Sequence, residues 1–290
     1  MEDATQSTSG AGTHSRRSVL RSVGGIGATM IGSAAAYRRD RTYEDDSGDG
    51  IPVERKRSGE LHDRLIEVFG AESFEGLEPG RADFLVDARY VGGATVDDRV
   101  KRYLEELFRD NGIYMQWLDH PNRIDGQQFL DEYGNDVRRI LWSRRSFYAR
   151  EIESDLKEVA FQLVVVPGRR DPPHEGRVYC QLSDSLQNGW NEGWINGMNT
   201  GNRAVVGHRD SPREQARLAL HEIAHLALCH DESTSNTGAM GTQERLDLTP
   251  TEWATLRGGL DAVRDTTGYD IVLRRCSWGE YVPSRPTCCG

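Results

Sequence analysis

The stretch SPREQARLALHEIAHLALCHD, residues Ser211 to Asp231, carries the local signals of a helix start. Ser211 is suited to cap a helix, Pro212 suits the first helical position, and Glu214 completes an S-x-x-E capping box. From Leu218 onward the helical run is apolar apart from two histidines and the glutamate that follows the first of them. A helix that is apolar nearly all round is buried. The stretch therefore predicts a buried helix, around which the other elements are arranged.

His221, Glu222 and His225 are the polar residues of this helix, and they form an H-E-x-x-H pattern. Two imidazoles four residues apart project from one helix face, one turn above the other. They can share a zinc ion, and Glu222 beside it can handle the proton of a water. The alternative is a chance match of two core histidines and a solvated glutamate, but burying these polar groups without a metal would be costly. The pattern predicts Zn²⁺ as cofactor.

The composition limits the classes of partner. The chain has 290 residues, enough for one or two domains, and a formal net charge of -10. Lysine occurs only at positions 56, 101 and 157, and this acidic, lysine-poor composition resembles proteins of salt-loving organisms, with an ordinary acidic protein as the alternative. Counterion release on nucleic acid needs a basic protein face. We therefore expect no nucleic-acid partner.

Residues 1–36 are predicted to be a targeting segment. Ser15 to Arg21, SRRSVLR, is similar to a twin-arginine export signal. The run from Val23 to Ala36 is mildly apolar and glycine-rich, too short and interrupted to span a membrane, and its last three alanines suit cleavage after Ala36. A disordered basic tail is the alternative. We expect the mature protein to be secreted or to lie at the cell surface. We also expect it to have no stable membrane span and to be a monomer.

Three further segments are predicted behind the signal. Residues 37–80 are polar and charged, which indicates a linker or an inhibitory pro-segment with one short helix at 61–69. Residues 81–275 form the folded domain. Residues 276–290 form a cysteine-containing tail, in which Cys276 is a candidate disulfide partner of Cys288 or Cys289, and Cys180 a further candidate.

Hydrophobic periodicity within 81–275 predicts an α+β fold of α/β-like character. Residues 82–91 and 113–118 read as strands on either side of a helix that opens at 95–98, which makes a parallel βαβ unit. The continuous apolar run 159–166 predicts a central buried strand. Further segments are a helical stretch at 127–151, a short strand at 177–182 and a last strand at 202–207. The result is a small, twisted, mostly parallel sheet packed with helices.

This element order, followed by a short methionine-bearing loop, resembles the metzincin clan of zinc endopeptidases, and its matrixin-like members in the brevity of its loops. The resemblance covers residues 81–262. Gly238 to Gly241 is similar to the family's Met-turn, with Met240 beneath the metal, and Leu248 to Trp253 is similar to the start of its C-terminal helix. The resemblance implies a metzincin-type zincin catalytic domain with an active-site helix and a C-terminal helix.

The chain departs from the family pattern H-E-x-x-H-x-x-G-x-x-H in two places. Leu228 stands where the family has glycine, and the sixth residue after His225 is Asp231, with His230 one position earlier. Spacing favours Asp231 as the third zinc ligand, whereas imidazole is the commoner ligand type, so both remain candidates. Cys229 could compete as a thiolate, although a small buried apolar residue describes it better.

The resemblance implies a secreted endopeptidase acting on polypeptides. Zinc with three protein ligands keeps a position open for water, and Glu222 serves as general base for the attack on a peptide carbonyl. The family's substrates lie antiparallel to an exposed strand of the sheet, for which residues 177–182 are a candidate, a plain edge being the alternative.

Two other classes of function remain open at this stage. One is a gluzincin-type zinc hydrolase, in which a later glutamate such as Glu252 is the third ligand. The other is a non-catalytic, zinc-stabilised, secreted binding protein. Trp190 and Trp194 are candidates for lining a cleft near the site, with core packing as the alternative.

Overall fold

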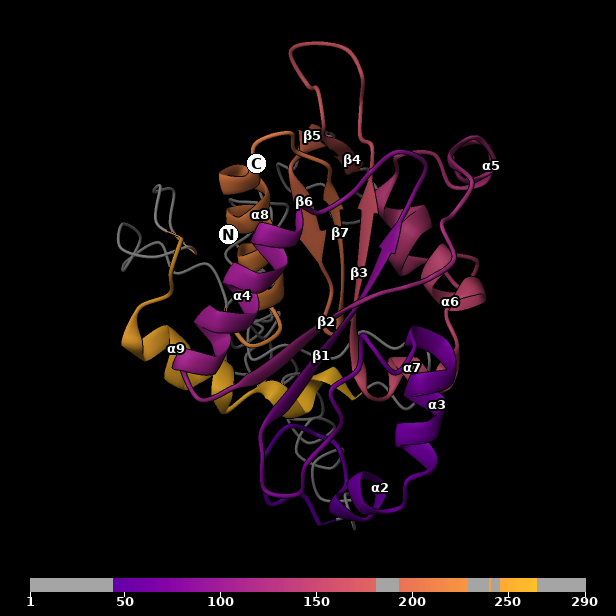
Figure 1. Ribbon diagram of the computed structural model, residues 1–290. Coiled ribbons are helices and arrows are strands. Elements are labelled where there is room, and N and C mark those ends of the chain that lie inside the picture. The colour runs from indigo at the N-terminus through magenta and orange to yellow at the C-terminus, as the bar shows by residue number, and fades with distance from the viewer. Residues whose placement is uncertain (1–43, 181–192, 229–239, 241–245, 265–290) are drawn as a thin grey trace, which may run out of the picture. The chain divides into compact units, whose positions relative to one another are not determined.

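The computed structural model describes residues 44–180, 193–228, 240 and 246–264, and these belong to one unit spanning Tyr43–Gly290 (Figure 1). Their main sheet has five strands in the order β2-β1-β3-β7-β6. The β1–β2, β1–β3 and β3–β7 pairs are parallel, and β6 alone runs antiparallel to its neighbour β7. The strands are β1 (Asp83–Tyr90), β2 (Tyr114–Asp119), β3 (Ala160–Val166), β6 (Gly197–Asn199) and β7 (Arg203–Gly207). The predicted mixed fold with a mostly parallel sheet is therefore confirmed.

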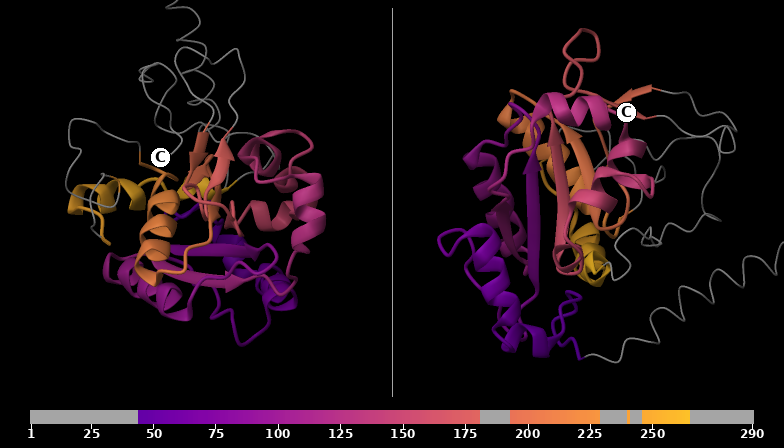
Figure 2. Two further views of the ribbon diagram at one scale, coloured as in Figure 1. Left: turned by 90° about the horizontal axis from the view of Figure 1, so that it is seen from above. Right: turned by 90° about the vertical axis from the view of Figure 1, so that its right-hand side faces the viewer.

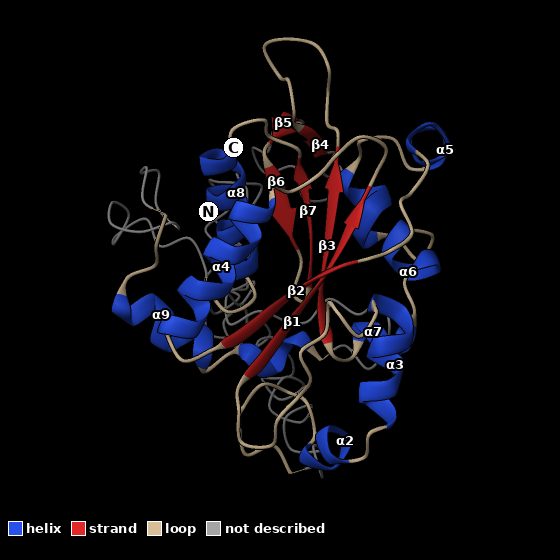
Figure 3. Ribbon diagram, viewed as in Figure 1, coloured by secondary structure: helices blue, strands red, loops and turns tan. Residues whose placement is uncertain are grey.

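Helices cover both faces of this sheet (Figures 2 and 3). One face packs against α4 (Asp98–Asp110), α8 (Pro212–Ala224) and α9 (Pro250–Arg257). The other face packs against a second set of helices. These are α3 (Glu60–Phe69), α5 (Gly126–Glu132), the π-helical turn η1 (Arg138–Trp142), α6 (Phe147–Glu151) and α7 (Ser154–Lys157). The remaining described helices are α2 (Val53–Arg57) and the 3-10 helix η3 (Leu260–Val263).

Strand β3 is the central strand that its apolar run predicts. Successive side chains of a strand point to opposite faces of its sheet. Leu163 and Val165 accordingly belong to the core with α4 and α8, whereas Val164 and Val166 belong to the core with α5 and α6. All residues of β3 are buried, which is why its sequence shows no polar alternation.

The helical stretch predicted at 127–151 is wrong in its continuity, because it consists of three short pieces. Gly134, at φ +62°, lies just after α5 and takes a conformation that glycine adopts without strain. Ser146 then accepts a hydrogen bond from the Ala149 N–H and starts α6 as its N-cap. Gly134 therefore marks the end of α5, and Ser146 marks the start of α6.

The linker prediction for 37–80 is wrong from residue 44 onward, where the described chain begins. Leu61, Leu65 and Phe69 of α3 are buried in a core cluster that includes Leu85 of β1. Helical spacing of these three apolar residues produces one buried face, and the sheet supplies the surface that covers it. The short helix predicted at 61–69 is confirmed as α3, but it is part of the folded unit.

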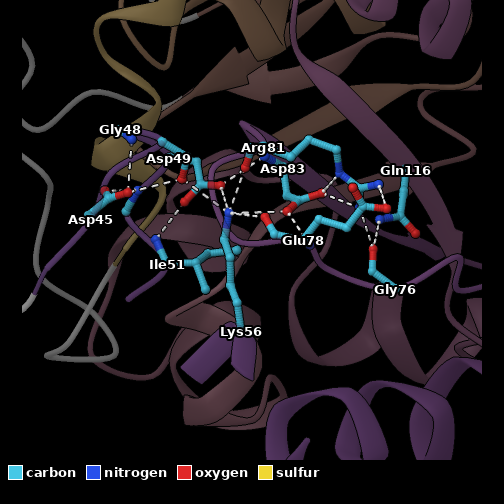
Figure 4. A network of polar contacts seen from close by, with 12 residues as sticks. Asp45, Gly48, Asp49, Ile51, Lys56, Gly76, Glu78, Arg81, Asp83 and Gln116 are labelled. Carbon is cyan, nitrogen blue, oxygen red and sulfur yellow. Dashed lines mark hydrogen bonds and ion pairs between the residues drawn. The ribbon is translucent and has the colours of Figure 1, made fainter. Parts of the chain in front are cut away.

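A buried ionic network fixes this segment to β1 (Figure 4). The Lys56 ammonium lies 2.5 Å from an Asp49 carboxylate oxygen and 3.1 Å from one of Asp83, and all three side chains are inaccessible to solvent. Lys56 also donates to the carbonyl of Arg81 at 2.7 Å. Since Asp83 is the first residue of β1, the network joins 44–57 to the sheet.

The short strand predicted at 177–182 is not an edge of the main sheet. It contains β4 (Val178–Cys180), which pairs antiparallel with β5 (Gly193–Ile195) in a separate two-stranded sheet. Residues 181 and 182 lie outside the described part. Within the described residues the strand at the edge beside α8 is β6.

Several predictions fall outside the described residues and stay predictions. They include the export signal at 1–36 and the disulfides of the tail at 276–290. No helix in the described ranges is long and apolar enough to cross a membrane.

Candidate metal centre

The helix that carries the H-E-x-x-H pattern begins with the N-cap and the first-turn proline that its sequence predicts. The Ser211 hydroxyl accepts a hydrogen bond from the Glu214 N–H at 3.4 Å, and Pro212 occupies the first helical position. Leu220 and Ile223 of α8 are fully buried against the sheet. The α-helix ends at Ala224, and His225 is its C-cap residue. The pattern therefore straddles the C-terminal end of α8, where the chain leaves the helix.

The two histidine rings meet on one side of the helix. Their centroids are 4.7 Å apart and their planes cross at 83°. His225 is buried, at 2% exposure, whereas His221 is partly exposed. The two rings therefore lie side by side, one buried and one partly open to solvent, as candidate metal ligands.

The hydrogen bond of His225 settles which nitrogen could bind a metal. Its Nδ1 lies 3.1 Å from the carbonyl oxygen of Leu228. A carbonyl can only accept, so Nδ1 is the donor in this contact, and Nε2 is the nitrogen that a neutral ring would offer to a metal. A backbone or carboxylate acceptor on the far nitrogen is typical of zinc-bound imidazoles. This hydrogen bond therefore fits His225 for zinc binding, and the carbonyl on its far nitrogen belongs to Leu228.

Glu222 has its carboxylate deep in the protein, with no exposed surface. It faces β6 at Gly197, where an added Cβ atom would lie 2.8 Å from the Glu222 Oε1 atom. Asn199, also on β6, donates from its side-chain amide to the Glu222 carbonyl at 2.8 Å. Strand β6 thus leaves space for the Glu222 carboxylate at Gly197 and binds the backbone carbonyl of Glu222 through Asn199.

Met240 is buried, at 7% exposure, in the core cluster that contains Ile223 and Leu226. The alternative of a solvent-exposed loop methionine is therefore wrong. The rest of the predicted Met-turn lies outside the described residues, so its conformation stays a prediction.

The candidates for a third zinc ligand close to His225 in the sequence lie outside the described residues. Asp231, His230 and Cys229 all lie outside them. Within the described ranges, no group of three His, Cys, Asp or Glu side chains comes together as a metal site would require.

Glu252, the candidate ligand of the gluzincin alternative, has a structural role in α9. Its side chain accepts a hydrogen bond from the Thr249 N–H at 2.6 Å, and the Thr249 hydroxyl accepts one from the Glu252 N–H. This reciprocal capping box holds the carboxylate at the start of α9. Glu252 also does not join His221 and His225 in a metal-binding group of described residues.

Trp190 lies outside the described residues, and Trp194 belongs to β5. The Trp194 ring packs on Tyr179, with centroids 5.3 Å apart, and on the guanidinium of Arg169 at 4.9 Å. It thus packs against Tyr179 of its own small sheet and against Arg169 outside that sheet, which agrees with the packing alternative.

The sequence analysis missed an open pocket of about 400 Å³ beside the first half of α8, which we term the arginine pocket. Arg177, Arg209 and Arg217 line it, together with Glu175 and Glu214. Burial lowers the pKa of the Arg209 guanidinium, Glu214 opposes this effect, and the positive charges of Arg177 and Arg217 lower it further. Arg217 stands four residues before His221, and this helical spacing was the sequence signal available.

No protein-family model, no curated protein and no solved structure matches this chain.

Proposed function

We propose that this protein is a zinc-dependent endopeptidase whose metal is held by His221 and His225. The observation that carries the proposal is the convergence of the two rings at 4.7 Å, with the outer nitrogen of His225 fixed by a backbone carbonyl. Zinc, when bound, would polarise a peptide carbonyl and make a water easier to deprotonate. The resemblance to metzincins supports the same function, with Asp231 or His230 as the third ligand.

Glu222 would act as the general base. Its position directly after His221 places it beside the metal site, and it would take a proton from the attacking water and pass it to the leaving amine. Gly197 leaves the space in which this carboxylate lies.

The polypeptide substrate would run along the edge of the sheet. Strand β6 ends the strand order next to α8, and it contacts Glu222 through Gly197 and Asn199. A peptide that pairs with an edge strand presents its carbonyls at regular intervals. The edge strand that supports this proposal is therefore β6, in place of the segment 177–182.

A metal analysis joined to one substitution tests the function. The purified chain is expected to contain one zinc per molecule and to cleave casein or a peptide library until a chelator is added. The variant Glu222→Gln should keep its zinc and lose about 10²- to 10⁴-fold in kcat, the range of a general base. The matched control is Glu106→Gln, at an exposed position of α4.

Two results would reject the proposal in different ways. A zinc-containing chain whose behaviour is unchanged in Glu222→Gln is the non-catalytic binding protein. A chain that loses its zinc in Glu252→Ala but keeps it in both Asp231→Ala and His230→Ala is the gluzincin-type enzyme.

A further inference from the structure

The three arginines of the arginine pocket have no carboxylate partner at ion-pair distance within the described part of the chain. The Arg209 guanidinium donates to the carbonyl of Glu175 at 3.3 Å and to the Asn196 side-chain oxygen at 2.6 Å. Arg177 donates to the Trp194 carbonyl at 3.5 Å. Among the described residues no Asp or Glu forms an ion pair with Arg177, Arg209 or Arg217, although the chain as a whole carries a net charge of -10. Three neighbouring guanidiniums without ion pairs are a site for an anion.

The pocket lies next to the candidate metal centre. Arg217 and Leu218 line it, and they lie one turn before His221 and Glu222 on α8, a rise of about 5.4 Å. Asn196 also lines it and directly precedes Gly197, the residue that faces the Glu222 carboxylate. Both α8 and the residue that precedes β6 therefore contribute to the pocket and to the surroundings of the candidate metal centre.

The two glutamates of the pocket do not cancel its preference for an anion. Glu175 and Glu214 are exposed, whereas Arg177, Arg209 and Arg217 are partly buried. Water screens the exposed carboxylates more strongly than the partly buried guanidiniums. A cationic side chain entering the pocket would meet three arginines, whereas an anionic one would meet their N–H groups.

We infer that the arginine pocket binds the carboxylate of an acidic side chain, Asp or Glu, of a polypeptide substrate, close to the bond that is cleaved. The inference deepens the proposed function and rests on it, because the bound polypeptide is a substrate only if the protein is a peptidase. Guanidinium groups present paired N–H donors that match the two oxygens of a carboxylate. One helical turn is also a distance that a side chain spans.

The test measures binding apart from cleavage. The full-length variant Glu222→Gln, treated with a chelator, is titrated with two fluorescein-labelled, C-terminally amidated peptides that differ only in one residue, Glu or Gln. The Glu peptide is expected to bind on the order of tenfold more tightly, as for one charge-assisted contact. Adding Arg217→Gln or Arg209→Gln should bring the ratio close to one.

Matched variants keep the result interpretable. Arg213→Gln changes an exposed arginine of α8 that does not line the pocket, and it should keep the tenfold preference. The side chain of Arg217 makes no hydrogen bond or ion pair in the described structure, so Arg217→Gln should fold normally, as circular dichroism would show. Arg217→Lys retains the charge without the paired donors and should keep part of the preference.

The outcomes separate the two proposals. Equal affinity for the Glu and Gln peptides, or a preference that survives in both Arg209→Gln and Arg217→Gln, would overturn the pocket assignment. A preference that follows a free C-terminal carboxylate, compared with the amide, would overturn the choice of a side chain as ligand. A pocket with the expected preference in a chain that never cleaves peptides would support the pocket and refute the peptidase.

Discussion

Gly197 leaves room for a carboxylate because it carries no side chain. A Cβ atom at this position would lie 2.8 Å from Oε1 of Glu222 and 3.0 Å from the carbonyl oxygen of Val205. A Cβ atom does not approach a non-bonded oxygen to 2.8 Å, and a contact of 3.0 Å is tight. The second contact is to backbone that is held by sheet pairing. The position of the Glu222 carboxylate therefore depends on a residue from a different element.

The substitution Gly197→Ala tests this dependence. The added methyl group should displace the Glu222 carboxylate and lower kcat on the order of 10²-fold, as for a misplacement of about 1 Å. It should also destabilise the fold by about 1–3 kcal/mol, the usual effect of overpacking. The zinc content should stay at the wild-type value, because the three atoms nearest to the added Cβ belong to Glu222 and Val205 and not to either histidine. Peptidase assays, metal analysis and urea denaturation measure the three effects.

A matched control is Gly93→Ala, since an added Cβ atom at Gly93 meets nothing within 4 Å. Neither glycine has the positive φ that favours glycine over alanine. Activity in Gly197→Ala equal to that of Gly93→Ala would show that Glu222 does not need this space.

At the scale of elements, β6 and α8 are joined by one buried amide. Asn199 is 3% exposed, and its Nδ2 group donates to the carbonyls of Glu222 at 2.8 Å and Gly201 at 3.1 Å. Both acceptors lie away from regular strand pairing, one near the end of the helix and one in the turn after β6. The amide therefore fixes the end of α8 to the edge of the sheet.

Replacing Asn199 should loosen this junction. We expect Asn199→Ala to lower the free energy of unfolding by about 1–3 kcal/mol, because two buried carbonyls lose a donor. Asn199→Asp should lower it more, since a carboxylate would face those carbonyls. Urea denaturation measures both, and Asn122→Ala, at an exposed position, serves as control. The junction has no such role if Asn199→Asp unfolds at the wild-type urea concentration.

The elements that the sequence predicted best are those with a local cause. Strand β3 follows from its continuous apolar run, and α8 follows from Ser211 and Pro212. The histidine pair follows from helical spacing alone. These features depend on neighbours in the chain, which a sequence displays directly.

The features that the sequence did not predict depend on residues far apart in the chain. Arg177 and Arg209 meet in one pocket only because β4 and the end of β7 come together beside α8. Gly197 matters only because it faces Glu222. The polar composition of 44–80 indicated a linker. The prediction failed because the few apolar residues of this segment, such as Leu65, pack against residues of β1 that lie later in the chain. Nothing in the local pattern encodes these contacts.

At the scale of the whole molecule, the segment 44–80 is held by charge as well as by apolar contact. Lys56, Asp49 and Asp83 have no solvent-exposed side-chain surface. Burial raises the pKa of the Asp49 carboxyl, while its contact with Lys56 acts in the opposite direction. Removing one member of such a group leaves a buried charge without compensation.

Lys56→Met should therefore lower the free energy of unfolding by about 3–5 kcal/mol, the usual effect of breaking a buried ion pair from one side. The control is Lys101→Met, whose partners Asp98 and Asp119 are exposed and whose loss should amount to about 0–1 kcal/mol. Urea denaturation of both variants gives the comparison. Adding Asp49→Asn to Lys56→Met should recover part of the loss, since it removes one of the two buried carboxylates.

High salt should have different effects on the stability losses of Lys56→Met and Lys101→Met. Interactions between exposed charges are screened at a Debye length of about 3 Å in 1 M salt, whereas buried pairs are screened much less. The effect of Lys101→Met should therefore disappear in molar salt, and the effect of Lys56→Met should persist. A loss in Lys56→Met that vanishes together with that of Lys101→Met would mean that water reaches the network. The segment 44–57 would then be only loosely attached to β1, and apolar contacts alone would hold it to the sheet.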